Sequence, residues 1–174
     1  TEVTDGPTEL PDSQRALARR EFQSLRELEA SDGDVRPRTL LEDVGELLWT
    51  HAGILRDDAS LLEGREKLDV LRARTRDLRV EGDRTGRDFE FAVDLSFTLQ
   101  IADALLASAL ERTESRGAHH RTDYPETDPE WRRNILVSEG TEGLSLRTRG
   151  VGEPSPAVQR AIDSGYELDY HHLE

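Results

Sequence analysis

The chain has 174 residues, enough for one domain that buries about 70% of its unfolded surface without disulfides. It has no cysteine, which excludes thiol catalysis and cysteine-bound zinc or iron–sulfur clusters within it. Its 37 acidic and 23 basic residues give a net charge of −14, which argues against nucleic acid as a partner. No stretch approaches about eighteen apolar residues, so no membrane span is predicted.

Residues 1–36 are predicted to be a linker followed by one helix. Residues 1–11 are polar and contain two prolines. Asp12 and Ser13 are typical helix caps, and a helix from there to about Ala30 would end at the polar turn 31–34.

Residues 37–134 are predicted to form the helical bundle. Pro37 suits the first turn of a helix, and apolar residues then recur at three- and four-residue spacing to His51, with the helix ending near Gly53. A capping box over 60–63 predicts the start of another helix, which continues to about Leu78. The longest helix is expected from about Asp88 to Thr113, with a buried stripe of Phe91, Leu95, Leu99, Ala102, Leu106, Ala109 and Leu110.

Residues 135–174 are predicted to hold a small hairpin, a short helix and a tail. The hairpin strands are expected at 135–137 and 144–146, around two glycines. Ser155 and Pro156 would begin the helix and Gly165 would end it. The expected fold is therefore mainly α: an antiparallel three-helix bundle with an additional N-terminal helix and a small C-terminal β-hairpin.

Histidines are the first candidates for chemistry, and none is assigned a catalytic or metal-binding role. His119-His120 and His171-His172 would need Asp123 or Asp169 to hold a metal ion, and adjacent side chains rarely point at one ion. His51 lies on an apolar helix face, which favours a satisfied core histidine over a catalytic base.

A charged loop over 114–129 follows the longest helix. It has two interpretations of equal weight on composition alone. The loop could be fixed by its own ion pairs, or it could dock on a neighbouring domain through arginines that bind carboxylates in bidentate fashion.

The same loop resembles a known family. Residues 114–128, Glu-Ser-Arg-Gly-Ala-His-His-Arg-Thr-Asp-Tyr-Pro-Glu-Thr-Asp, and the following Trp131 resemble the E-S-R-G-x-H-x-R-x-D-x-P-x-x-D…W signature of succinate dehydrogenase, fumarate reductase and L-aspartate oxidase flavoproteins. Residues 47–56 resemble an upstream segment of that family, with Ala52 in place of the usual valine. Two motifs in the right order, within about residues 37–137, identify the chain as similar to the C-terminal domain of this family.

The resemblance implies that FAD and the substrate-binding residues belong to upstream domains. No cofactor-binding residue is therefore assigned to this chain, which is expected to hold no FAD and to be inactive alone. Its implied partners are the flavin-binding and capping domains of the same protein, and a homo-oligomer is left open. Five residues are expected to hold the interdomain contact: Glu114, Arg116, His119, Arg121 and Asp123.

Details of the loop resemble L-aspartate oxidases more than dehydrogenases, because the sequence has Thr122 where dehydrogenases tend to carry an acidic residue and Arg132-Arg133 after the tryptophan. The implied reaction is oxidation of L-aspartate to iminoaspartate, in cytoplasmic NAD biosynthesis. Two alternatives stay open: the same domain of a succinate dehydrogenase or fumarate reductase flavoprotein, and a stand-alone helical binding module.

The balance of charges also indicates a salt-loving host. All basic residues except Lys67 are arginine, and carboxylates are dense. In concentrated salt their repulsion is screened while they keep the surface hydrated.

Overall fold

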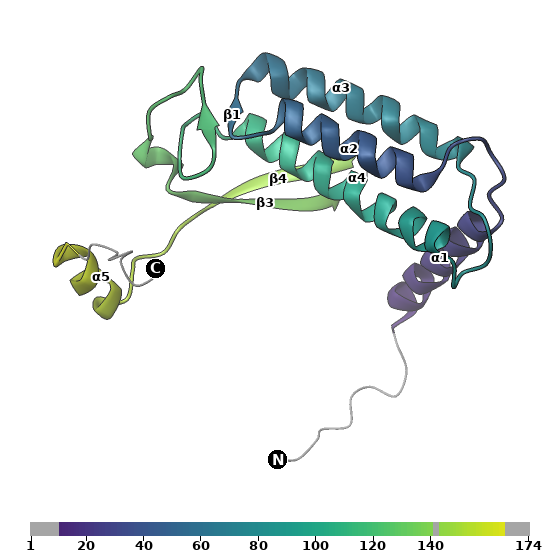
Figure 1. Cartoon of the computed structure of the whole chain (residues 1–174). Coiled ribbons are helices and arrows are strands. Elements are labelled where there is room, and N and C mark those ends of the chain that lie inside the picture. The colour runs from purple at the N-terminus through teal and green to yellow at the C-terminus, as the bar shows by residue number, and fades with distance from the viewer. Residues whose placement is uncertain (1–10, 141–142, 166–174) are drawn as a thin grey trace, which may run out of the picture.

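The computed structural model describes residues 11–140 and 143–165, and it confirms the expected mainly helical fold (Figure 1). Three helices form the bundle: α2 (Pro37–His51), α3 (Asp58–Arg74) and α4 (Arg87–Glu111). A fourth, α1 (Asp12–Glu29), lies at one end of the bundle beside the start of α4. The division into parts at residues 36 and 134 stays a prediction, and the tail with His171-His172 lies outside the described residues.

The core lies between α2, α3 and α4, as the apolar spacing predicts. Each helix turns leucines inward at three- and four-residue intervals, which is the spacing of one helix face. Close packing at one crossing requires glycine, because a Cβ on Gly64 would lie 2.8 Å from the Cβ of His51. The fully buried leucines are Leu40, Leu61, Leu68, Leu95 and Leu106.

Two predicted helix starts were wrong. Helix α3 begins at Asp58, and its cap is Asp57, whose side chain accepts from the Ser60 amide, so Ser60 is not the cap. Helix α1 has Pro11 as its N-cap, without a side-chain cap bond. Asp12 instead lies in the first turn and binds Arg15 at 2.7 Å, where a carboxylate favours the helix dipole.

The turns between the helices also differ from expectation. Helix α3 ends at Arg74 and continues as a 3-10 turn, η1 (Thr75–Asp77), so Leu78 is buried outside the helix. The chain there pairs with the segment before α2 through single bridges, Val35 with Leu78 and Asp32 with Arg79. These bridges hold the two turns at the α1 end of the bundle together.

The C-terminal part is a hairpin followed by a short helix. Strands β3 (Arg133–Gly140) and β4 (Gly143–Gly150) pair antiparallel and are longer than expected. The hairpin lies along α4, and α5 (Pro156–Asp163) projects from its end (Figure 1). Ser155 caps α5 by accepting from the Val158 amide, as predicted.

By length and composition alone, α4 is apolar enough to cross a membrane, although no span was predicted from the sequence. This is weak evidence for a span, since the core helix of a packed domain has the same composition. In the part of the chain that the structure describes, no other helix has this character.

Candidate docking site

The charged loop follows α4 and folds back onto the start of α3. Its short strand β2 (His120–Arg121) pairs in parallel with β1 (Leu55–Arg56), the segment just before α3. The Thr122 amide donates to the Arg56 carbonyl at 2.8 Å and extends this pairing. The two segments that resemble the flavoprotein family are therefore neighbours in space.

Arg121 is the centre of the loop and is fully buried, with 0% exposure. One guanidinium nitrogen donates to the carbonyls of Ala109 and Arg112, at 2.9 and 3.3 Å, near the C-terminal end of α4. Those carbonyls have no partner within the helix, and a cation is favoured at this end of the helix dipole. The buried arginine thus serves as a C-terminal cap for α4.

The same guanidinium joins the loop to α3. It forms a bidentate pair with Asp123, at 2.8 and 2.7 Å, and also donates to Asp58, the first residue of α3. Asp123 in turn accepts from the Asp58 amide at 3.0 Å. The Arg121 hydrogen bonds hold the pKa of Asp123 well below its usual range, so the pair is ionised at neutral pH.

Glu114 is the second buried charge, also with 0% exposure. Arg116 donates to both of its carboxylate oxygens, at 2.8 and 3.0 Å, and Arg112 donates to one of them. The Asp128 amide adds a bond of 2.9 Å. The bonds from Arg116, then from Asp128 and Arg112, outweigh burial and lower the pKa of Glu114 to about 2.

Ser115, between these charges, closes the loop. Its hydroxyl accepts from the Arg121 amide at 2.9 Å and donates to the Tyr124 carbonyl at 2.8 Å. Gly117, with φ +57°, forms the turn that brings Arg116 and His119 into reciprocal backbone hydrogen bonds. These bonds, with the one from the Ser115 amide to the Glu126 carbonyl, give the loop its own hydrogen-bond network.

His119 is half-buried, and its hydrogen bonds fix its tautomer. Arg56 can only donate, so Nδ1, at 2.9 Å from its guanidinium, must be the acceptor. Nε2 then carries the proton and donates to the Arg112 carbonyl at 3.1 Å. Burial, and the charge of Arg56 and its neighbours, lower the pKa of His119, so the ring is neutral at pH 7.

This geometry changes what the five predicted docking residues can do. Glu114 and Arg121 have no exposed surface in this chain, and their hydrogen bonds hold the loop to itself and to the bundle; that they also support an interdomain contact stays a prediction. Arg116 remains exposed, and Asp123 and His119 are partly so. That the loop as a whole docks on a neighbouring domain stays a prediction.

Three residues that build the site were missed from the sequence. Arg112 stacks on the Trp131 ring at 5.1 Å and donates to the Trp131 and Arg133 carbonyls. Ser115 lies in the quoted family signature but was not chosen as a site residue, because a serine in a loop is ordinary on a surface. Asp58 had no signal of its own, since its contact with Arg121 joins two segments that are far apart in the sequence.

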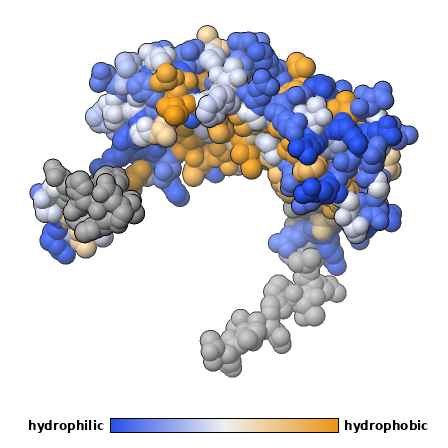
Figure 2. Space-filling view, viewed as in Figure 1, coloured by the Kyte–Doolittle hydropathy of each residue, from blue (hydrophilic) through white to orange (hydrophobic). Residues whose placement is uncertain are grey.

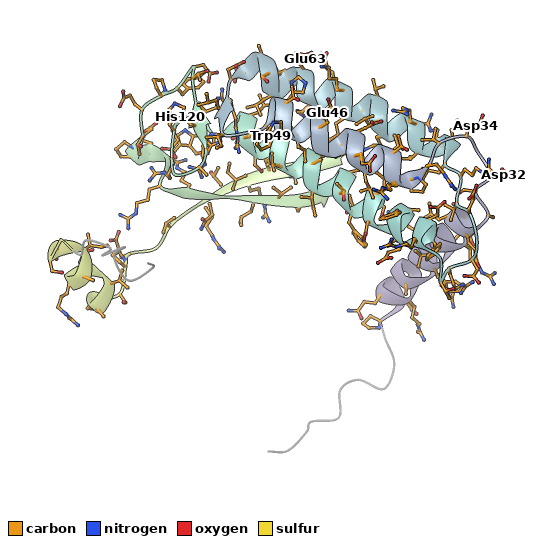
Figure 3. The ribbon with its side chains drawn as sticks, in the orientation of Figure 1. Asp32, Asp34, Glu46, Trp49, Glu63 and His120 are labelled. Atoms are coloured by element: carbon orange, nitrogen blue, oxygen red, sulfur yellow. The ribbon has the colours of Figure 1, made fainter. Side chains whose placement is uncertain are left out.

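The histidines are placed as the sequence favours. His51 is buried at the end of α2, with its ring nitrogens 3.3 Å from the Ser60 hydroxyl and 3.2 Å from the Lys67 amine. His120 is exposed within the loop, in β2 (Figure 3). Among the described residues, no group of three or more histidine, aspartate or glutamate side chains is arranged to hold a metal ion.

The sequence matches the family described as the fumarate reductase flavoprotein C-terminal domain over residues 41–159, more than half of the chain. A CoM/CoB fumarate reductase subunit of Methanothermobacter marburgensis is 34% identical over 74% of this chain and 23% of its own length. An L-aspartate oxidase of Pyrococcus abyssi is 40% identical over 49% of this chain and 14% of its own length. The chain thus spans about a quarter or less of these relatives.

Solved structures share the fold. FrdA of E. coli quinol fumarate reductase has a TM-score of 0.76 at 24% identity, covering 87% of this chain and 27% of FrdA, a likeness of fold alone. A chain of the Mycobacterium smegmatis Sdh1 complex has a TM-score of 0.68 at 26% identity, covering 94% of this chain and 30% of that one.

Proposed function

We propose a function from one premise: this chain belongs to the family of fumarate reductase flavoprotein C-terminal domains. It acts as the C-terminal helical domain of an FAD-dependent oxidoreductase for four-carbon dicarboxylates. Its role is to pack against the domains that hold the flavin and the substrate. The observation that carries this proposal is the family match over residues 41–159 of a chain that spans only 23% of a full-length relative.

The described residues do not fit a flavin site of the dinucleotide-binding kind. Such a site needs a glycine-rich turn between a strand of a parallel sheet and a helix. The sheets here are two-stranded: the antiparallel hairpin and the two-residue parallel pair β1–β2. The flavin would therefore be bound by the upstream domains, and that this chain alone holds none stays a prediction.

An open apolar face on α4 supports a packing role. Phe97 and Ile101 are 58% and 64% exposed, and Leu105 continues the same stripe one turn further on. Figure 2 shows apolar side chains gathered along the concave lower face of the molecule, over α4 and the hairpin. An apolar surface of this kind on a folded domain marks an interface, and the upstream flavin-binding part of the same polypeptide is its proposed partner.

The packing role is tested in the full-length protein by Ile101→Asp, which places an unpaired charge in the proposed interface. We expect loss of retained flavin and of activity, read from flavin absorbance after gel filtration. The matched control is Val70→Asp, since Val70 is similarly exposed, at 62%, but lies on α3. If both variants retain flavin and activity equally, α4 is not the packing face.

For the substrate, the longer matches favour fumarate or succinate, because the fumarate reductase relative covers 74% of this chain. L-aspartate is the second candidate, favoured by Thr122 to Pro125 and by 40% identity to an L-aspartate oxidase over 85 residues. NAD biosynthesis and a cytoplasmic location follow only from the second candidate and stay predictions.

Assays of the purified full-length protein with succinate, fumarate and L-aspartate separate the two candidates. Turnover of L-aspartate alone would overturn the dicarboxylate proposal. For the isolated chain we expect a colourless preparation, and a flavin absorbance band would contradict the assignment of the flavin to upstream domains.

A further inference from the structure

The two faces of the β3–β4 hairpin differ in chemistry. Residues directly opposite each other in an antiparallel pair share a face. Leu144 and Leu146 lie on one face of β4 and line a groove together with Ala107 and Leu110 of α4. On the other face, Arg147 lies opposite Leu136 and Arg149 opposite Asn134. Side chains with nitrogen at their tips project from the hairpin away from the helices (Figure 3).

Three arginines of this region are exposed and have no ion pair among the described residues: Arg132, Arg147 and Arg149. Arg132 immediately precedes β3, and its carbonyl accepts from the Val151 amide at 3.1 Å, so it lies at the Arg149 end of the hairpin. The strand positions on this outer face, 134, 136 and 138 with 145, 147 and 149, include no acidic residue.

This cationic face is unusual in this molecule. The chain carries a net charge of −14, and arginines of the bundle are mostly paired, as Arg36 is with Glu81 and Asp88. Exposed arginines without an ion pair keep their full bidentate capacity for an external carboxylate. Leu136, half-buried and directly opposite Arg147, adds an apolar side chain to this face.

We propose that the outer face of the β3–β4 hairpin, formed by Arg132, Leu136, Arg147 and Arg149, is a docking surface for an acidic protein surface. Charge complementarity selects this partner. Arg147 and Arg149 are two residues apart on one strand, so their Cα atoms are roughly 7 Å apart, which matches the spacing of carboxylate-bearing residues at alternate positions of an extended segment. The surface has this character whichever reaction the full-length protein catalyses.

The test measures binding of a fluorescent peptide in which glutamate alternates with serine, with a glutamine–serine peptide as the neutral probe. We expect the 174-residue chain to bind the acidic peptide at low salt and not the neutral one. The double variant Arg147→Gln, Arg149→Gln should weaken binding about tenfold. The control Arg76→Gln, Arg87→Gln removes the same charge from exposed arginines that also lack an ion pair among the described residues, and should change binding less than about twofold.

A second variant, Arg132→Gln, lies outside both strands and keeps the test valid if the double variant fails to fold, which circular dichroism would reveal. It should weaken binding about threefold. Equal losses in the hairpin and control variants would overturn the proposal, because only net charge would then matter. Binding of duplex DNA or of phosphatidylserine vesicles as tight as that of the acidic peptide would overturn it too, since the face would then be a general anion surface.

Discussion

Glu114 shows at the scale of one residue how the loop is stabilised. The carboxylate is fully buried and receives hydrogen bonds from Arg112, Arg116 and the Asp128 amide. Removing one member of such a pair leaves an uncompensated charge, which costs more than the pair contributes. Loss of the Glu114 carboxylate should therefore lower the free energy of unfolding of the chain itself, whether or not another domain is bound.

Replacing Glu114 with glutamine should lower the free energy of unfolding by about 3 kcal/mol, measured by urea denaturation. The control is Glu130→Gln, because Glu130 pairs with Arg133 while its side chain is 85% exposed, and it should change stability by less than about 1 kcal/mol. If the two substitutions lowered the free energy of unfolding by similar amounts, the burial of Glu114 would not contribute to stability.

The pKa of Glu114 also predicts a pH dependence. Its folded pKa is about 2 against an ordinary value of 4.5, so the unfolded state binds more protons between these values. The stabilisation is complete above pH 4.5 and is lost as pH falls toward 2. Urea midpoints measured across this window should fall more steeply for the natural chain than for Glu114→Gln; parallel curves would contradict the lowered pKa.

His119 should remain neutral, with its proton on Nε2, at pH values where an ordinary histidine is charged. Its pKa is lowered in the folded state, so its contribution to stability is present above about pH 6.5 and is lost as pH falls below that value. A nitrogen-detected NMR titration of the ring reports both tautomer and pKa. His119→Gln provides the assignment control, and a ring that titrates above pH 6.5 would refute the prediction.

At the scale of elements, the contact of α2 with α3 depends on one missing side chain. A Cβ at Gly64 would approach His51 and the Leu106 methyl, at 2.8 and 3.2 Å, and neither lies at the flexible end of an exposed chain. The helices therefore approach as closely as they do because position 64 has no Cβ.

Gly64→Ala should destabilise the protein by about 2 kcal/mol through overpacking, despite the better helix propensity of alanine. Gly45→Ala is the matched control, since Gly45 lies in α2 and a Cβ added there would meet no atom within 4 Å. That substitution should stabilise by about 0.5 to 1 kcal/mol. The melting temperatures of both variants test this prediction. If both substitutions raised the melting temperature, the α2–α3 contact could accept a Cβ at position 64.

At the scale of the whole molecule, the net charge of −14 should make stability depend on salt. Raising KCl from about 0.1 M to about 1 M shortens the Debye length from about 10 Å to about 3 Å and screens repulsion between surface carboxylates. We expect the melting temperature to rise by several degrees. Sorbitol at equal osmolality controls for solvent effects, and an equal rise in sorbitol would remove the electrostatic explanation.

The sequence by itself determined the helices and the family. Apolar residues at three- and four-residue spacing located α2, α3 and α4, since this period is a local property of the chain. The order of the two motifs in 47–56 and 114–128 was also sufficient for the family. The start of α3 was not determined in this way, because Asp57 and Ser60 are both residues that favour the N-cap position, and in the structure the side chain of Asp57 accepts the capping hydrogen bond.

The tertiary structure alone decided what the charged loop does. A sequence predicts exposure for Arg121 and Glu114, because burying a charge is costly unless partners are in place. Those partners come from Asp58 and the end of α4 for Arg121, and from Arg112 and Asp128 for Glu114. The partners of Arg121 meet only when the start of α3 lies beside the end of α4. The partners of Glu114 are nearer in the sequence, but Asp128 reaches it only when the loop folds back on the end of α4. Burial of the two charges is thus a consequence of tertiary structure, which no local pattern of residues contains.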